Sequence, residues 1–241
     1  MAAFEKGDYS RAVSLFEQAA NENNDPSLQF LLGTLYYDGS GAPKDERKAV
    51  QWFEKSAKGG YAEAATFLGL IYLEGDIVPR NMAEAAKWYR ISADAGEADA
   101  QYYLAQLYYD GEGVHKDLNE AFRWRQAAAD QGYLEAERKL GFMYYDGDGV
   151  LQDYEKAAFW LVKGAEKDDP VSQLGLARLY EEGKGVPRDL IEAYKWADLS
   201  GAYEIEEAVA LRERVHSQMT QEQLVKAKKE VEKWREAEPE Y

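Results

Sequence analysis

The residues that could do acid–base or metal chemistry are few in this chain of 241 residues, which has two His and no Cys. His115 and His216 have no Cys, Asp or Glu at a ligand spacing such as His-Glu-x-x-His. We therefore predict neither a metal site nor a general base at these positions. Asp and Glu number 45, but spacing alone singles out no carboxylate pair of the kind that hydrolyses glycosides.

Glycine pairs raise the separate question of phosphate binding. They follow helical patterns rather than strands, and they lack a third Gly or a Gly-Lys-Ser/Thr ending. We interpret them as helix caps and tight turns, and we predict no catalytic residue and no cofactor. The pairs are Gly111/Gly113, Gly147/Gly149 and Gly183/Gly185.

One set of carboxylates recurs at a fixed step of 36 residues: Asp38, Glu74, Asp110, Asp146 and Glu182. The position before it reads Tyr37, Leu73, Tyr109, Tyr145 and Glu181. A carboxylate in the last turn of a helix is disfavoured by the helix dipole, by about 0.3–1 kcal/mol. Its presence in all five units therefore indicates a use other than helix stability.

The elements that must position these side chains follow the same step of 36 residues, without insertions. The most regular positions are Leu32, Leu68, Leu104, Leu140 and Leu176; Tyr36, Tyr72, Tyr108, Tyr144 and Tyr180; and Trp52, Trp88, Trp124, Trp160 and Trp196. Invariant positions at one period predict a repeat array rather than two globular domains.

Each unit shows two helical patterns, which we call helix A and helix B. In the second unit Ala64, Leu68 and Ile71 form one apolar face of helix A, which Gly75 ends. Asn81 with Glu84 is a capping box that opens helix B. We expect each Trp of helix B to be buried between its own helix A and the next unit.

Helix B is predicted to end at Gly60, Gly96 and Gly132 in three units. The fourth unit has Lys167-Asp168-Asp169 instead, which predicts a different turn. The predicted organisation is one repeat domain over 1–241: a half repeat at 1–24, five repeats at 25–61, 62–97, 98–133, 134–169 and 170–203, and capping helices at 204–241.

The unit resembles the Sel-one-like repeat, a relative of the tetratricopeptide repeat. Residues Leu140-Gly141, Tyr144, Gly147, Gly149-Val150, Asp153, Ala157 and Trp160 match its pattern in full. Unit two departs from the pattern at Asp76-Ile77-Val78. The resemblance implies an all-α, right-handed superhelical solenoid of stacked antiparallel helix pairs, with a concave groove that holds partner proteins or peptides.

By analogy with tetratricopeptide arrays, the second face of helix A lines this groove. The predicted partner-binding residues are Tyr37, Asp38, Glu74, Tyr102, Tyr109, Asp110, Phe142, Tyr145, Asp146 and Glu182. Acids attract cations and Tyr makes adaptable contacts, so we expect a non-enzymatic scaffold for a Lys- or Arg-rich segment. The alternative is a ligand-binding or hydrolytic protein acting on cell-wall or other small substrates, although the chain lacks the paired Cys of family members linked to such ligands.

The net charge of −16 repels phosphate backbones and anionic lipid headgroups. We therefore expect neither nucleic acid nor a membrane surface as a partner, and no apolar run is long enough for membrane insertion. The chain starts inside a helical pattern at Met1-Ala2-Ala3-Phe4. This start would suit an exported or periplasmic bacterial protein whose leader was removed, and it leaves a cytoplasmic protein open.

Overall fold

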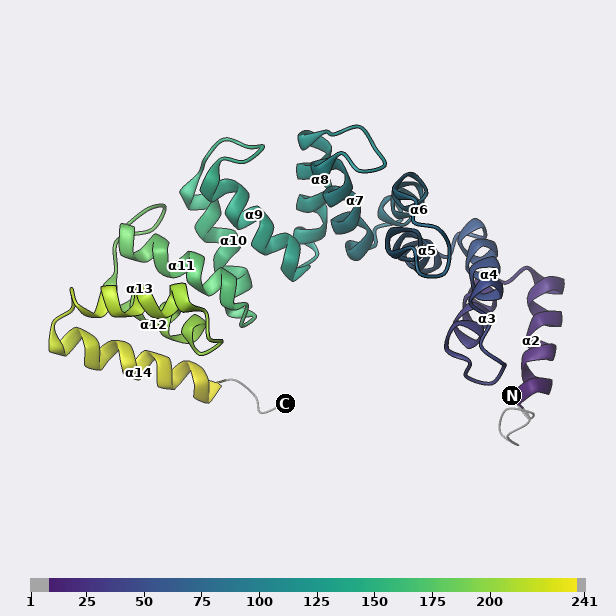
Figure 1. The fold of residues 1–241 in the computed structure, drawn as a ribbon. Helices are drawn as coiled ribbons and strands as arrows, with labels where there is room; N and C mark the ends of the chain where they lie inside the picture. Colours follow the sequence, from purple (N-terminus) through teal and green to yellow (C-terminus); the bar gives the residue numbers. More distant parts are fainter. Residues whose placement is uncertain (1–8, 238–241) are drawn as a thin grey trace. The chain divides into compact units, whose positions relative to one another are not determined.

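The computed structural model describes residues 9–237, in which all regular elements are helices (Figure 1). The prediction of an all-α solenoid is confirmed. The helices are α2 (Tyr9–Asn23), α3 (Pro26–Asp38), α4 (Glu46–Lys58), α5 (Ala62–Glu74), α6 (Met82–Asp94), α7 (Ala98–Asp110), α8 (Leu118–Asp130), α9 (Leu134–Asp146), α10 (Tyr154–Glu166), α11 (Pro170–Glu182), α12 (Leu190–Gly201), α13 (Glu206–His216) and α14 (Gln221–Ala237).

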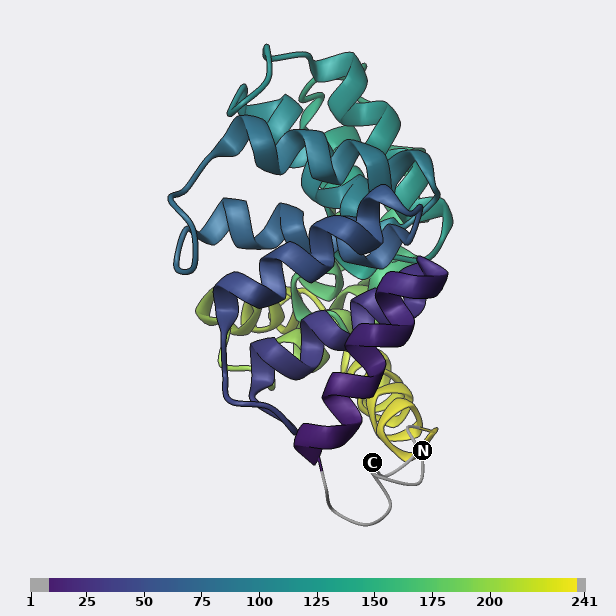
Figure 2. The same ribbon diagram turned by 90° about the vertical axis from the view of Figure 1, so that its right-hand side faces the viewer.

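The helices fall into two compact units, of which unit 1 ends at Trp124 and unit 2 begins at Arg125, within α8. The A helices are α3, α5, α7, α9 and α11, and the B helices are α4, α6, α8, α10 and α12. In unit 1, α3 packs against α4 and α5 against α6, and each B helix also packs against the A helix that follows it (Figure 2). In unit 2 the same order runs from α9 to α12, and α13 and α14 pack on α12.

Side-chain caps fix where the helices start. The carboxylate of Asp25 accepts hydrogen bonds from the backbone N–H of Ser27 and Leu28, ahead of Pro26 in the first turn. Asn81 caps α6 in the same way. Thr220 and Gln223 form a reciprocal capping box at the start of α14, with bonds of 2.9 and 3.2 Å. The predicted start of α6 at Asn81 is therefore confirmed, although the Asn81 N–H donates to Tyr72 O rather than to the Glu84 side chain of a capping box.

The same backbone hydrogen bond closes the loop between helix A and helix B in each of the five repeats. The N–H of the residue that caps helix B donates to the carbonyl of the recurring Tyr of helix A; for example, Asn81 N lies 2.9 Å from Tyr72 O. The equivalent bonds join Asp45 to Tyr36, Asp117 to Tyr108, Asp153 to Tyr144 and Asp189 to Tyr180. The loop therefore fixes the end of helix A relative to the start of helix B.

The turn after helix B is the same in the fourth repeat as in the others, so the predicted difference was wrong. Asp168 has φ 60°, in the left-handed region that Gly60 and Gly132 occupy at φ 95° and 83°. An Asp tolerates this region better than most residues. Its carboxylate also accepts a hydrogen bond from Gln173 Nε2 at 2.8 Å, which ties the turn to α11.

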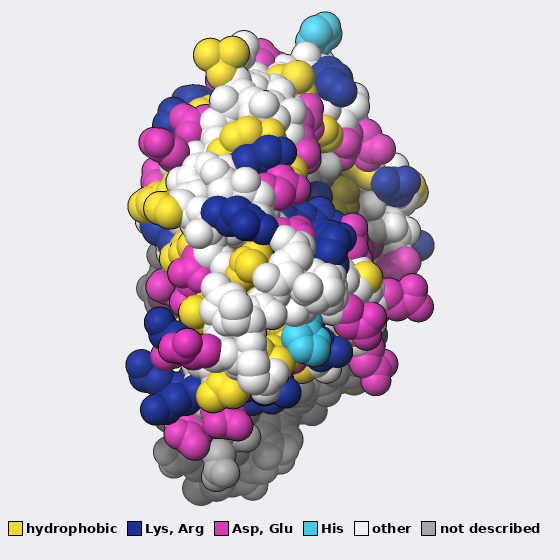
Figure 3. Space-filling view, turned by 90° about the vertical axis from the view of Figure 1, so that its left-hand side faces the viewer, with side chains coloured by type: hydrophobic (Ala, Val, Ile, Leu, Met, Phe, Trp, Pro, Cys, Tyr) yellow, Lys and Arg dark blue, Asp and Glu magenta, His cyan; other side chains and the backbone are white. Residues whose placement is uncertain are grey.

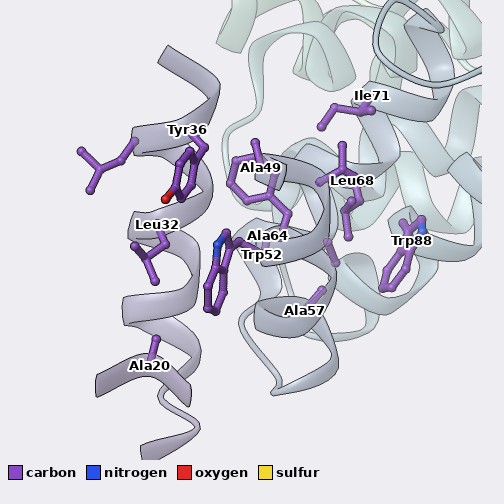
Figure 4. Packing of buried hydrophobic residues seen from close by; sticks show 14 of the residues in the cluster. Ala20, Leu32, Tyr36, Ala49, Trp52, Ala57, Ala64, Leu68, Ile71 and Trp88 are labelled. Carbon is purple, nitrogen blue, oxygen red and sulfur yellow. The ribbon is translucent and has the colours of Figure 1, made fainter. Parts of the chain in front are cut away.

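The core is a ladder of small and aromatic side chains between successive helices (Figure 4). All five Trp of the B helices are buried, with exposures of 5–7%, as predicted. The predicted neighbour was wrong for Trp88, whereas Trp196 meets Trp234 of the following helix α14, with ring centres 5.0 Å apart. Trp88 belongs to a cluster with Trp52 and Phe53 of the preceding helix B and Leu68 of its own helix A. It packs toward the preceding repeat rather than the following one.

Candidate functional site

The recurring acids occupy the last residue of each A helix, and all five side chains are exposed. The next residue is a Gly in the left-handed conformation, with φ between 69° and 83°, which caps the helix. The carboxylates thus lie at the negative end of the helix dipole, where they stabilise nothing in the helix. We call these residues the acid row: Asp38, Glu74, Asp110, Asp146 and Glu182.

The five carboxylates of the acid row differ in the charged or polar groups that lie beside them. Within residues 9–237, no Lys or Arg lies within ion-pair distance of Asp38, Glu74 or Asp146. Asp110 Oδ2 accepts a hydrogen bond from Gln106 Nε2 at 2.7 Å, so its charge is not neutralised by that contact. Glu182 alone has a cation, Lys184, whose Nζ lies 2.7 Å from Oε2. Within the described residues, the acids of repeats one to four therefore all lack a cation at ion-pair distance.

Basic residues in the loops beside the row make their closest contacts with groups outside it. Lys44 Nζ lies 2.7 Å from Glu46 Oε1. Arg80 Nε donates to the Leu73 carbonyl at 3.1 Å, and its Nη2 lies 3.7 Å from Glu112 Oε2. Lys44 also interacts electrostatically with Asp38, whereas no cation of the described residues lies within ion-pair distance of Glu74.

Next to the acid row lie half-buried side chains that we call the Tyr row: Tyr37, Leu73, Tyr109 and Tyr145. Lysines of the following loops lie over two of the rings, with Nζ of Lys44 5.8 Å from the centre of Tyr37 and Nζ of Lys116 5.4 Å from that of Tyr109. Tyr145 instead meets Tyr154 edge-on, with ring centres 5.5 Å apart. The row therefore presents aromatic edges and hydroxyls rather than open ring faces.

In the fifth repeat the Tyr position holds Glu181, which is engaged within unit 2. Its carboxylate accepts two hydrogen bonds from the Arg214 guanidinium of α13, at 2.7 and 2.8 Å. This bidentate pairing, together with Gln218, lowers the pKa of Glu181 below its ordinary value of 4.5, although burial opposes the change. Glu181 therefore attaches the capping helix α13 to α11.

We predict that Glu181→Gln destabilises the protein at neutral pH and not in acid. A carboxylate whose pKa is lowered on folding stabilises the fold above its unfolded pKa and loses that contribution as the pH falls through its folded pKa. The expected loss at pH 7 is about 0.5–1 kcal/mol, because Arg214 is largely exposed to screening solvent. Thermal unfolding at pH 7 and pH 3 measures it, with the unpaired Glu232→Gln as control; a difference that persists at pH 3 would contradict the assignment.

Tyr145 shows how the two rows meet in unit 2. Burial raises the pKa of its hydroxyl, and the negative charge of Glu182, one repeat further on, adds to the effect. Phe142 lies edge-on to the same ring, with centres 6.5 Å apart. The acid of one repeat therefore lies beside the Tyr of the repeat before it, and the structure brings three predicted site residues together here.

The remaining predicted aromatic, Tyr102, is half-buried and lies edge-on to Tyr103, with ring centres 5.6 Å apart. Other members of its repeat position face the interior instead. Arg138 Nη1 lies 2.8 Å from the buried carboxylate of Asp169, and Leu174 is only 6% exposed. This position therefore does not form a continuous line of binding side chains.

Sequence reasoning missed Lys184, a cation of this chain that pairs with the last carboxylate of the acid row. Its ammonium pairs with Glu182 and lies 5.1 Å from the centre of the Tyr154 ring. The signal was present in the sequence as a reversal of charge, because the equivalent loop positions are Ser40, Asp76, Glu112 and Asp148. On the face drawn in Figure 3, acidic and basic side chains are interspersed and hydrophobic ones form small separate areas.

The two His lie in unlike surroundings. His115 is exposed, with Nδ1 2.9 Å from the Lys116 carbonyl, and His216 lies edge-on to Tyr194. Among the residues that the structure describes, no group of three or more His, Asp or Glu gathers as a metal site. None of the helices in the same range is both long and apolar enough to cross a membrane.

Comparison with known proteins agrees with this architecture. The sequence model of the Sel1 repeat matches six segments, residues 4–24, 26–61, 62–97, 98–133, 134–169 and 170–201. Over 64 residues the chain is 39% identical to the Sel1-repeat-containing protein YjcO of Escherichia coli K12. That match covers 24% of this chain and 28% of YjcO, so it reflects individual repeats.

Two solved structures are similar over most of the chain. A Sel1 repeat protein from Oxalobacter formigenes is 34% identical with a TM-score of 0.75, covering 83% of this chain and 82% of that one. The protective antigen c5321 of uropathogenic Escherichia coli, also 34% identical with a TM-score of 0.75, shares 81% of this chain and 42% of its own length. Repeats of this type generally mediate protein–protein interactions and are generally non-enzymatic. On its repeats and its fold, the chain belongs to the Sel1 repeat family.

Proposed function

We propose that this Sel1 repeat protein is a non-enzymatic scaffold whose A helices bind a segment of a partner protein carrying Lys or Arg. The observation that carries the proposal is that the exposed carboxylates of Asp38 and Glu74 in unit 1, and of Asp146 in unit 2, have no Lys or Arg at ion-pair distance within residues 9–237. Each lies at the unfavourable end of a helix dipole, so an external cation would relieve a cost that the fold leaves in place.

A second observation supports an ammonium as the group bound. At the fifth repeat the chain's own Lys184 places its Nζ 2.7 Å from the acid-row carboxylate of Glu182 and over an aromatic ring. A partner's Lys would meet the same kind of carboxylate at Glu74 or Asp146, but without the ring, because the positions equivalent to Tyr154 hold Glu46 and Leu118.

The acid row should act mainly on the rate of association. We expect Glu74→Gln combined with Asp146→Asn to slow association with a native partner about three- to tenfold at low salt, since exposed charges steer encounter. Glu74→Gln alone has a matched control in Glu182→Gln, which also removes one negative charge but one already paired with Lys184, and which should change association less. Affinity should also fall with rising salt, because these charges are screened within about 8–10 Å.

The Tyr row should act mainly on dissociation, because contact area holds a formed complex together. Tyr37→Ala with Tyr145→Ala should speed dissociation about 10–100-fold. A partner isolated from the native host by cross-linking, then measured by surface plasmon resonance against both double variants, tests both expectations. Unchanged kinetics in both, with the partner cross-linked to B helices, would overturn the proposal.

A further inference from the structure

The A helices of unit 1 carry a solvent-facing surface without charged residues. Helices α3, α5 and α7 contain no Lys or Arg, and their acids occupy only the second and the last position, as Glu63 and Glu74 do in α5. Between these ends, one exposed or half-buried face of each helix holds four uncharged residues at helical spacing, although 31% of the chain is charged. We call these residues the uncharged band: Phe30, Leu31, Thr34 and Tyr37; Thr66, Phe67, Leu70 and Leu73; Tyr102, Tyr103, Gln106 and Tyr109.

Side-chain contacts join the uncharged band across the three helices. The ring of Phe30 on α3 meets that of Phe67 on α5, with centres 5.5 Å apart. Leu73 of α5 packs against the buried cluster that contains Leu104 of α7. The band is therefore one surface of unit 1, and it is mainly apolar and aromatic.

The repeat itself does not require these positions to be uncharged. In unit 2 half of the equivalent positions are charged, and the fold accommodates them: Arg138 pairs with Asp169, and Arg178 pairs with Glu207. The equivalent residues of unit 2 are Arg138, Lys139, Phe142, Tyr145, Leu174, Gly175, Arg178 and Glu181. A partly exposed apolar surface restricted to unit 1 therefore indicates contact with another molecule rather than a need of the fold.

The width of the uncharged band matches an α-helix lying across the three A helices. Its members span seven positions on each helix, from Thr66 to Leu73 on α5, which is about 10.5 Å along the axis. An α-helix with its side chains is about 10–12 Å across. The acids Glu63 and Glu74 lie beyond both edges of the band, about 16.5 Å apart along the same axis.

The charge pattern favours the same conformation of the partner. An amphipathic helix has an apolar stripe bordered on both sides by polar residues, so Lys or Arg at these borders would reach the acids at the two edges. In a β-strand, successive side chains point to opposite faces. The cations of a strand whose apolar residues lay on the band would therefore point away from the acids.

We propose that the uncharged band of unit 1 binds the apolar face of an amphipathic helix in a partner protein, with Lys or Arg along both borders of that face. This inference rests on the proposed function and narrows it to one unit and one class of segment. Apolar contacts with the band would supply most of the affinity, and the acids at its two edges would orient the helix.

The test uses the full chain and three synthetic peptides, measured by fluorescence anisotropy at low salt. The first peptide places Leu at helical spacing on one face, with Lys along both borders and Ala elsewhere. The second has the same composition in scrambled order, and the third replaces each Lys of the first by Glu. We expect the first peptide to bind about tenfold more tightly than the scrambled one, which cannot gather its Leu on one face.

Two variants of the chain locate the binding surface. Leu31→Lys introduces into the band the residue that the fourth repeat has at the same position, Lys139, and should weaken binding of the first peptide about 5–10-fold, because it places a charge against an apolar surface. Ile91→Lys on α6 is the matched control, since Ile91 is 41% exposed and Leu31 is 42% exposed. It makes the same change of charge in the same unit, outside the band, and should leave binding unchanged.

The possible outcomes separate this inference from the proposed function. Equal binding of the first and scrambled peptides, or equal losses in the two Lys variants, would overturn the inference and leave the proposed function standing. Binding of the first peptide no tighter than that of the Glu peptide would overturn both. Self-association in sedimentation that Leu31→Lys abolishes would assign the band to a second copy of this chain, and would also overturn the inference.

Discussion

Replacing Trp124 by Ala is expected to lower the free energy of unfolding by about 3–5 kcal/mol, as other buried aromatic truncations do. The side chain is 7% exposed and packs among Tyr89 and Ala93 of α6 and Leu104 of α7. The indole Nε1–H also donates to Glu120 Oε2 at 3.0 Å. Truncation would therefore leave a cavity between two repeats and remove the donor from that bond.

Urea denaturation followed by circular dichroism measures this loss. Because each repeat of an array contacts only its neighbours, unfolding of the variant should also lose cooperativity and show a lower m-value. Asn119→Ala, on the exposed side of the same helix, is the control and should change stability by less than about 0.5 kcal/mol. A midpoint unchanged by Trp124→Ala would mean that the indole does not belong to the core.

The helices could be predicted from sequence because their boundaries depend on local chemistry. Asp25-Pro26 specifies a helix start through one carboxylate and one ring, and Gly75 specifies a helix end through one left-handed residue. Neither cap depends on a distant contact, so the helix boundaries can be recognised within a single repeat. Their recurrence every 36 residues strengthens the prediction. The buried Leu and Trp positions follow for the same reason.

The turn at Asp168 could not be predicted, because its backbone is set by packing rather than by its own residue type. Asn24, Gly60, Gly96, Gly132, Asp168 and Glu204 share one repeat position and all have positive φ. The helices on either side impose that conformation wherever the array continues. The direction in which Trp88 packs was missed for a related reason. A period of 36 residues does not indicate whether a side chain packs against the preceding or the following repeat.

The exposure of the acid row could be predicted, but its internal partners could not. Long charged side chains reach across a repeat: Arg214 binds Glu181, and Arg138 binds Asp169. Such pairs join residues about one repeat apart. The repeat pattern does not specify with which of several nearby charges a flexible side chain forms an ion pair. Whether the row binds a partner stays a prediction.

Small residues on helix A follow the residue that faces them on helix B. Gly69 lies under the ring of Tyr89, where an added Cβ would come within 2.6 Å of a ring carbon. Gly141 similarly faces Leu161. In the fifth repeat both facing positions hold Ala, at Ala177 and Ala197, and both are fully buried. In the fifth repeat the methyl group gained on helix A is therefore matched by a smaller side chain on helix B.

The second Gly of the Gly-x-Gly loop should be among the least replaceable residues of the chain. Gly113 has φ 72°, and a Cβ there would lie 2.2 Å from the backbone carbonyl of Met82, at the start of the preceding helix B. We expect Gly113→Ala to cost about 2–5 kcal/mol, of which about 1–2 kcal/mol reflects the left-handed backbone. Overpacking against a backbone that cannot rotate away adds about 1–3 kcal/mol. Urea denaturation of the whole chain measures the sum.

Gly60→Ala separates the two contributions, because Gly60 has φ 95° but an added Cβ would meet no atom within 4 Å. It should show the backbone cost alone, about 1–2 kcal/mol. The second repeat indicates how the close contact could be avoided: Ile77 takes the place of the second Gly, with no positive φ, and packs half-buried against the core. If Gly113→Ala costs no more than Gly60→Ala, the loop has moved to an arrangement of that kind, and the close approach to Met82 is not required for the repeats to stack.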